Sequence, residues 1–351
     1  MKILADLHHS DLYYSLQLLF EKRLDAELFR PIGLEWYEQG YWHVYPHSNT
    51  ARQYLATDQA QWAPRDVHGN ELPPSAVLNK NYRYEDGIYY ISDPTKKGIV
   101  NRGITLEKFK SMEFDILISS IPPHIGPFNS LIAQFQPRAK HIFQVGNAWG
   151  HQPGVRNILA STSPFPVPAG TNVCFYHQEF DLDVFYYAPP TVRNRVTSYI
   201  HYMKGKEMMN RCASALPGWE FRSFGAGMED GIMETHLIAD SMRNSAFIWH
   251  NKPEGDGFGY SIFEAFAVGR PPVVNGGQYQ GKLASRLFSH MSTCIDVNQL
   301  RGQSLPQILL AIAGNPSWHN QMCEAATNQF KKFVNYDADE LRIREFLGRL
   351  Q

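Results

Sequence analysis

Residues 254–275, EGDGFGYSIFEAFAVGRPPVVN, decide the fold that the sequence predicts. The apolar residues 246–250 (AFIWH) directly before them predict a short strand. A glycine-rich turn follows at 255–259, and then an apolar run at 260–268 that is too long for a buried strand. We expect this run to be a helix that Gly269 ends as a C-cap, followed by a second strand at 271–274. Strand, glycine turn, helix and strand form one βαβ unit.

The glycine turn has the composition of an anion site. Glycines let a backbone approach a ligand closely, and the N–H groups and dipole of a helix N-terminus favour an anion such as a diphosphate. Asp256 and Glu264 bracket the turn, where an acid is well placed to accept hydrogen bonds from sugar hydroxyls. The alternative is an ordinary loop, with glycines for turning and acids near a helix start.

The segment from Asp256 to Ala265, followed by Gly269 and Pro271, resembles the E-x7-E signature of retaining, nucleotide-sugar-dependent glycosyltransferases of the GT-B fold, of the family 4 type. The first acid of that signature is aspartate in this chain. The resemblance implies an α/β protein with two Rossmann-like domains that face each other across a cleft. It also implies a UDP- or GDP-sugar donor, retention at the anomeric carbon, and no required metal. The residues expected to bind the donor are Lys204, Gly225, Gly257, Phe258, Gly259, Tyr260 and Ser261.

The whole chain fits a globular protein of two domains. It has 351 residues, of which 43% are hydrophobic and 19% are charged. The net charge of −1 gives no global attraction to nucleic acid or to an anionic membrane. The four cysteines are widely spaced and form no metal-type pair, so we expect buried free thiols in a reducing cytoplasm. Neither a signal peptide nor a membrane span is expected.

The start of the chain predicts a strand at 1–7, a turn, and an amphipathic helix at 12–24. Ligands bind at the carboxyl edge of such sheets, so His8, His9 and Asp11 in the turn should face the cleft. They are candidates for acceptor contact, with a helix cap or a metal site as the alternatives. Residues 35–97 are rich in aromatic residues and predict an irregular, packed insertion, either shaping the acceptor site or forming a structural flap.

Buried strands are predicted at 114–121 and 140–145, with a break at 122–127 and a helix from 128 to 135. The first of these strands is loosely similar to a strand of the same enzymes that bears a histidine. Where several relatives place a histidine after the next strand, this chain has Gly146 and Asn147. We therefore name His124 and Asn147 as candidate catalytic residues beside Asp256 and Glu264, and His151 as a further acceptor candidate.

The second half opens with a strand at 196–201, and the domain boundary is expected at 189–190. Lys204 lies where the family lysine contacts donor phosphate, although it also fits a solvated lysine at a helix start. The expected domains are residues 1–189 for the acceptor and 190–335 for the donor. Residues 336–351 are expected to form a helix that returns to the first domain, with Leu341, Phe346, Leu347 and Leu350 on its apolar face.

These features predict a cytoplasmic glycosyltransferase that moves a sugar from a nucleotide sugar to a hydroxyl group. The acceptor is a saccharide or glycan, or a hydroxymethylated pyrimidine in DNA, and a lipid-linked acceptor is disfavoured because the chain has no amphipathic basic helix. The alternative functions are a sugar-nucleotide epimerase and a non-catalytic nucleotide-sugar-binding protein on the same fold.

Overall fold

A computed structural model describes residues 1–6, 10–32, 35–41, 82–92, 99–146, 150–201, 203, 206–225, 227–231, 233 and 235–351. The chain divides into two compact units. Unit 1 comprises Met1–Ser161, Phe165–Glu179 and Asp337–Gln351, and unit 2 comprises Thr162–Pro164 and Phe180–Tyr336. Most of the predicted insertion at 35–97 lies outside the described residues.

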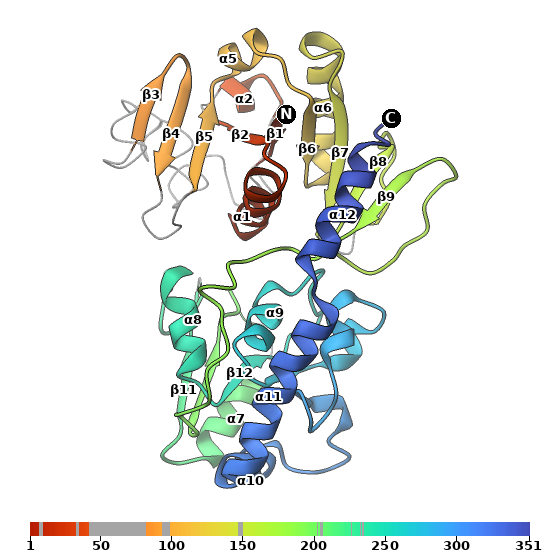
Figure 1. Ribbon diagram of the computed structural model, residues 1–351. Coiled ribbons are helices and arrows are strands. Elements are labelled where there is room, and N and C mark those ends of the chain that lie inside the picture. Colours follow the sequence, from red (N-terminus) through yellow and green to blue (C-terminus); the bar gives the residue numbers. More distant parts are fainter. Residues whose placement is uncertain are drawn as a thin grey trace. The chain divides into compact units, whose positions relative to one another are not determined.

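Unit 1 is built on a sheet of nine strands within the described residues, in the order β3-β4-β5-β2-β1-β6-β7-β8-β9 (Figure 1). Its strands are β1 (Lys2–Ala5), β2 (Glu27–Pro31), β3 (Tyr82–Glu85), β4 (Ile88–Ser92), β5 (Val100–Ile104), β6 (Ile116–Ser119), β7 (Lys140–Val145), β8 (Asn157–Ala160) and β9 (Asn172–Phe175). All neighbours pair in parallel except β3 with β4 and β4 with β5, which are antiparallel. The described part of the insertion therefore extends the sheet through the hairpin β3–β4.

The helices of unit 1 include several that differ from the prediction. They are α1 (Ser10–Gln17), the π-helix η1 (Leu18–Arg23), α2 (Glu35–Glu38), α5 (Leu106–Ser111), α6 (Pro122–Phe135) and α12 (Tyr336–Leu347). The predicted helix at 12–24 changes to π-helical geometry at Leu18. The predicted break at 122–127 is wrong, because α6 begins at Pro122. Prolines in the first turn of a helix lose no helical hydrogen bond, so Pro122 and Pro123 start this helix instead of interrupting it.

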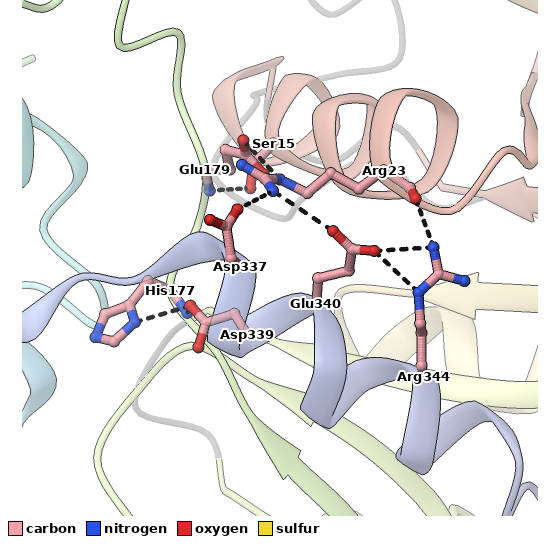
Figure 2. Close-up of polar contacts among 8 residues, drawn as sticks. All are labelled: Ser15, Arg23, His177, Glu179, Asp337, Asp339, Glu340 and Arg344. Atoms are coloured by element: carbon pink, nitrogen blue, oxygen red, sulfur yellow. Dashed lines mark hydrogen bonds and ion pairs between the residues drawn. The ribbon is translucent and has the colours of Figure 1, made fainter.

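The C-terminal helix α12 is held to unit 1 by charged and polar contacts (Figure 2). Arg23 at the end of η1 bonds Glu179 at 2.8 Å and Asp337 at 2.7 Å, and Glu340 lies 3.5 Å away. The buried carboxylate of Asp339 accepts hydrogen bonds from the backbone N–H of His177 at 3.0 Å and from its ring at 2.9 Å. These contacts fix the first two turns of α12 against the segment that ends at Glu179.

Of the four residues predicted for the apolar face of α12, Phe346, Leu347 and Leu350 pack against the core of unit 1 and Leu341 does not. Ile343 and Phe346 are fully buried in the core of unit 1, whereas Leu341 is 65% exposed. Asp339, Ile343 and Phe346 lie at positions i, i+4 and i+7, which form one helical face, and Leu341 falls outside it. The C-terminal end of the chain lies beside β8 and β9. Asn157 in β8 donates a hydrogen bond to the carbonyl of Gln351, and Asn172 in β9 donates one to the carbonyl of Phe346.

Replacing Arg23 with methionine should loosen α12. The change removes the guanidinium from Glu179 and Glu340, which are mostly shielded from solvent, and from the exposed Asp337, so we expect a loss of about 2 kcal/mol in unfolding free energy. Hydrogen exchange should become faster in α12 before it does so in β1 or β6. The control is Arg138→Met, because Arg138 is exposed and its ion pair with the exposed Glu113 is long, at 3.9 Å. Unchanged exchange in α12 would contradict the role assigned to Arg23.

Unit 2 is built on a sheet of five parallel strands within the described residues, in the order β11-β10-β12-β13-β14. The strands are β10 (Arg195–Ser198), β11 (Glu220–Ser223), β12 (Phe247–His250), β13 (Pro272–Val274) and β14 (Ile295–Asp296). The α-helices are α7 (Glu207–Ala215), α8 (Thr235–Arg243), α9 (Tyr260–Ala267), α10 (Leu305–Gly314) and α11 (Pro316–Phe333). The 3₁₀-helices are η3 (Gly276–Tyr279), η4 (Leu283–Leu287) and η5 (Val297–Gln299). Figure 1 shows α9 and α11 side by side in this unit.

The chain passes from unit 1 to unit 2 at an earlier residue than the expected position 189–190. Phe180 and Phe185 already belong to the core of unit 2, where the ring of Phe180 packs against Tyr260, Phe330 and Tyr336. The boundary therefore lies at Glu179–Phe180, because these aromatic side chains find their apolar contacts in unit 2. The four cysteines are buried with free thiols, as the sequence predicts.

Candidate functional site

The βαβ unit predicted from residues 246–274 is present as β12, α9 and β13. The two strands pair in parallel, and α9 packs on both. Strand β10 has β11 on one side and β12 on the other, so the direction of chain progression reverses between β10 and β12. In sheets of this kind, ligands bind at the carboxyl ends of the strands that flank such a reversal. The glycine loop, which leaves the carboxyl end of β12, is therefore in the position where a ligand is expected.

The start of α9 is shaped by Gly259 and Phe258. Gly259 is the N-cap residue and has the left-handed conformation, with φ of +81°, which favours glycine. Its carbonyl accepts hydrogen bonds from the N–H groups of Ile262 at 2.8 Å and Phe263 at 3.3 Å. The Phe258 side chain is buried and stacks on Phe263 with ring centroids 4.1 Å apart, so only its backbone faces the loop. The amides of Tyr260 and Ser261 open the helix, where a helix has no internal acceptor for them.

The carboxylate of Asp256 is the centre of a polar network beneath this loop. Its Oδ2 lies 2.5 Å from Nε2 of His250 and accepts a hydrogen bond from the hydroxyl of Tyr279 at 2.9 Å. Its Oδ1 accepts from the ammonium of Lys252, and its backbone carbonyl accepts from Lys282 at 2.5 Å. The side chain of Asp256 is 20% exposed. Both carboxylate oxygens are thus already bound to protein groups.

The network keeps Asp256 ionised. Burial alone would raise the pKa of this carboxyl group, but the charges and hydrogen bonds of His250 and Lys252 outweigh burial and hold the pKa well below its ordinary value. Burial raises the pKa of Tyr279, and the Asp256 carboxylate raises it further, because a neighbouring negative charge disfavours a phenolate. Asp256 therefore keeps its negative charge within this network.

This ionisation predicts an acid-sensitive contribution to stability. The pKa of Asp256 is lower in the folded chain than in the unfolded chain, where an aspartate titrates near ~3.9. The stabilisation is therefore present above about pH 4 and is lost as the pH falls below that value. Measured between pH 6 and pH 2.5, the unfolding free energy of Asp256→Asn should fall less steeply than that of the wild-type chain. Parallel curves would contradict the role assigned to this carboxylate. Asp6 and Glu220, whose pKa values are also lowered, would contribute to the slope that remains.

His250 links Asp256 to the start of α9. The imidazole is 3% exposed and ends β12. Its Nε2 faces Asp256, and its Nδ1 lies 3.0 Å from the hydroxyl oxygen of Ser261 in the first turn of α9. The imidazole ring of His250 thus joins the end of β12 to the glycine loop and to the start of α9.

Glu264 lies one turn further along α9 and is buried, with 5% of its surface exposed. Its charge contributes to raising the pKa of Tyr199, after burial, which places the carboxylate near the residue that follows β10. Tyr199 donates a hydrogen bond to Ser241 at 2.7 Å. Glu264 and the glycine loop thus both lie close to the reversal of the sheet between β10 and β12.

Gly225 lies where the loops after β10 and β11 come close together. Its φ is +141°, and a Cβ there would lie 2.9 Å from the carbonyl oxygen of Ile200 and 3.0 Å from His201. Glycine is therefore required for this approach. Lys204, the predicted phosphate ligand in the same region, lies outside the described residues.

Unit 1 carries a second polar cluster at the corresponding reversal of its own sheet, between β1 and β6. Asp6 follows β1 and accepts hydrogen bonds from the backbone N–H and the hydroxyl of Ser120, which follows β6. His124, in the first turn of α6, places Nδ1 2.6 Å from Asp6 and stacks on Phe128. Both members of the pair are buried, so in this structure the His124 ring is closed to an acceptor molecule.

The other predicted residues of unit 1 are less informative. His151 is half-buried in the segment between β7 and β8. Asp11 lies in α1, but its side chain is outside what the structure describes, as are His8, His9 and Asn147. No group of three or more His, Cys, Asp or Glu side chains suited to a metal ion occurs among the described residues. In that same part of the chain, no helix is both long and apolar enough to cross a membrane.

Sequence reasoning missed most of the partners of Asp256. His250 and Lys252 are close in sequence, and a histidine that ends a predicted strand beside an acidic glycine loop is a signal that could have found one of them. Tyr279 and Lys282 come after β13, and nothing in their local sequence points back to Asp256.

Comparison with known proteins gives matches in structure but not in sequence. No protein-family model matches the chain, and no curated protein matches it. HepE from Anabaena, in complex with UDP and glucose, is similar over 100% of both chains, with a TM-score of 0.61 and 11% identity. An alpha-glucosyltransferase in complex with UDP matches over 99% of this chain and 100% of its own, with a TM-score of 0.61 and 11% identity. A sucrose-phosphate synthase from Thermosynechococcus elongatus matches over 98% of each chain, again with a TM-score of 0.61 and 11% identity.

These similarities confirm the predicted fold class. The chain has the GT-B fold, with two Rossmann-like α/β units whose sheets are mainly parallel. The alpha-glucosyltransferase has also been solved with UDP and a 13-mer DNA containing an HMU base, and in that form it matches with a TM-score of 0.58 and 11% identity.

Proposed function

We propose that this protein is a glycosyltransferase that moves a sugar from a UDP-sugar to a hydroxyl acceptor, with retention at the anomeric carbon. The observation that carries the proposal is the start of α9, where a left-handed Gly259 presents two helix-opening amides at the reversal of a parallel sheet. That HepE and the alpha-glucosyltransferase were solved with UDP supports a uridine nucleotide as the donor.

In the proposed complex, the donor diphosphate binds the amides of Tyr260 and Ser261. The hydroxyls of the ribose donate hydrogen bonds to Glu264, whose carboxylate lies one turn further into α9. We propose Lys204 as a cation for the phosphates, on the resemblance alone, and the loop at Gly225 as a further contact to them. Departure of UDP places negative charge on the diphosphate, and donors fixed in advance at this position stabilise that charge.

Removing one such donor typically costs on the order of 3 kcal/mol of transition-state stabilisation. In this proposal, unit 2 stabilises the charge on the departing diphosphate through the amides at the start of α9 and the polar network around Asp256.

Two acceptor classes follow from the proposal. One is a saccharide or glycan, and the other is a hydroxymethylated pyrimidine in DNA. The DNA-bound form of the alpha-glucosyltransferase supports the second. The net charge of −1 gives no global attraction to DNA, so contacts to DNA would have to come from a local basic surface.

A donor panel tests the proposal. Purified protein is mixed with UDP-glucose, UDP-N-acetylglucosamine or GDP-mannose, alone and with glycans or hydroxymethylated DNA, and free nucleoside diphosphate is measured. Acceptor-dependent release of UDP, with the sugar recovered on the acceptor in the α configuration from an α-linked donor, is the expected result. Conversion of the nucleotide sugar without transfer would identify an epimerase, and binding without turnover would identify a non-catalytic protein.

The salt dependence of acceptor binding distinguishes the two acceptor classes. If DNA is the acceptor, the apparent affinity for it should fall steeply between about 50 and 200 mM salt, because binding releases counterions from phosphates. A glycan acceptor should give kinetics that are nearly independent of salt.

A further inference from the structure

We infer that His250 is a positioning residue for the donor diphosphate: it holds the hydroxyl of Ser261 in the direction of the phosphates, and Asp256 anchors His250 from the opposite side. The inference rests on the proposed function and assigns Asp256 a role other than contact with the transferred sugar. It concerns only residues of unit 2.

The first step is the geometry around the imidazole. Nε2 lies 2.5 Å from the carboxylate of Asp256, and Nδ1 lies 3.0 Å from the Ser261 oxygen, so both ring nitrogens have fixed partners. The ring is 3% exposed and therefore cannot itself bind the diphosphate. Ser261 is half-buried in the first turn of α9, beside the amides that open the helix. His250 can therefore affect a bound diphosphate only through its contact with Ser261.

The second step is the direction of the hydrogen bond at Ser261. A hydroxyl has one hydrogen to donate and can also accept. When Nδ1 of His250 carries a hydrogen, it donates to Ser261, and the hydroxyl hydrogen of Ser261 is then available for a phosphate oxygen. The Asp256 carboxylate can only accept hydrogen bonds, so it fixes Nε2 as a donor and holds the plane of the ring, which keeps Nδ1 directed at the Ser261 oxygen.

The third step is the support behind Asp256. Tyr279, from η3, donates to the same oxygen that faces His250, and Lys252 bonds the other oxygen. Lys282 fixes the backbone carbonyl of Asp256 at 2.5 Å. These partners come from separate segments and fix the carboxylate from several directions, which is the arrangement that holds a positioned side chain in one rotamer. Asp256 thus sets the orientation of His250, and His250 sets that of Ser261.

Calorimetric titration with UDP and with uridine tests the inference. Uridine lacks the diphosphate, so a residue that acts on the phosphates changes the affinity for UDP and leaves the affinity for uridine unchanged. Ser261→Ala is expected to weaken UDP binding about tenfold, which corresponds to one hydrogen bond to a charged group. His250→Leu is expected to have a similar effect, and Ser261→Thr, which keeps the hydroxyl, should retain most of the affinity for UDP.

The double variant His250→Leu, Ser261→Ala decides whether the two residues act as one. If His250 acts through Ser261, the double variant binds UDP about tenfold more weakly than wild type, no worse than either single variant. A loss of about a hundredfold, the product of two independent effects, would overturn the inference. So would an equal loss of affinity for UDP and uridine, which is the signature of a damaged fold. If His250→Leu does not fold, His250→Phe serves in its place, because it keeps a ring in the buried position without the two nitrogen atoms.

Two further variants separate the role of Asp256 from the alternative. Asp256→Asn should weaken UDP and UDP-glucose by the same factor, whereas weaker binding of UDP-glucose alone would mean that Asp256 contacts the sugar. Tyr186→Phe, the same substitution at an exposed tyrosine that packs against Arg243 and takes no part in the network, is the control and should change UDP affinity less than twofold. A wild-type chain that binds neither UDP nor GDP would overturn the proposed function itself, while binding that is indifferent to these variants would overturn only the inference.

Discussion

Glu264→Gln is expected to reduce sugar transfer about a hundredfold while leaving the fold intact. In the proposed complex, the carboxylate accepts hydrogen bonds from both ribose hydroxyls, and an amide offers only one acceptor oxygen. Losing one charge-assisted hydrogen bond and weakening the other costs about 3 kcal/mol. Glutamine has the size of glutamate, so the buried position in α9 stays filled. Turnover with UDP-glucose and the midpoint of thermal unfolding are the two measurements.

The matched control is Glu254→Gln. Glu254 is an exposed acid at the other end of the glycine loop, and its substitution should change turnover less than twofold. If Glu264→Gln kept full activity, or if it lowered stability as much as activity, Glu264 would be a structural residue of α9 and not a donor ligand.

Asp256→Ala is expected to lower both stability and nucleotide affinity. The substitution leaves His250, Lys252 and Tyr279 without the carboxylate that they share, and breaking such a largely buried pair costs about 3 kcal/mol. We expect the unfolding free energy in urea to fall by about that amount and UDP affinity to fall about tenfold. Asp240→Ala is the control, because Asp240 is an exposed acid whose partner is Arg243, and surface pairs contribute little. Loss of activity with unchanged stability would show that the network contributes nothing to the fold.

The sequence predicted the elements of unit 2 well because their signals are local. An apolar run between glycines identifies α9 as a helix, and its neighbours β12 and β13 are short apolar segments on either side. Strand β7 has the predicted bounds for the same reason. The start of α6 was missed because prolines were interpreted as a break, although the same residues are compatible with a first helical turn.

The candidate site was predicted only in part, because its polar contacts are not local. Asp256 was expected to face a sugar, but its environment depends on Tyr279 and Lys282, which reach it from η3 and the turn that follows. The burial of His124 depends on Asp6, which follows β1, more than a hundred residues earlier. The spacing of residues within one motif carries no information about such partners.

The same limit applies to α12. Its periodicity placed Leu341 on the buried face, whereas the buried acid Asp339 sets the orientation of the helix through His177. A polar residue at a core position is the feature that a pattern of apolar residues cannot detect.

The most direct test of the central claim is a crystal structure of the protein with UDP. Our account predicts that the diphosphate lies within hydrogen-bond distance of the backbone nitrogens of Tyr260 and Ser261, with the ribose beside Glu264. If UDP at saturating concentration left the start of α9 empty, or bound with its phosphates at another part of the chain, the proposed donor site would be wrong.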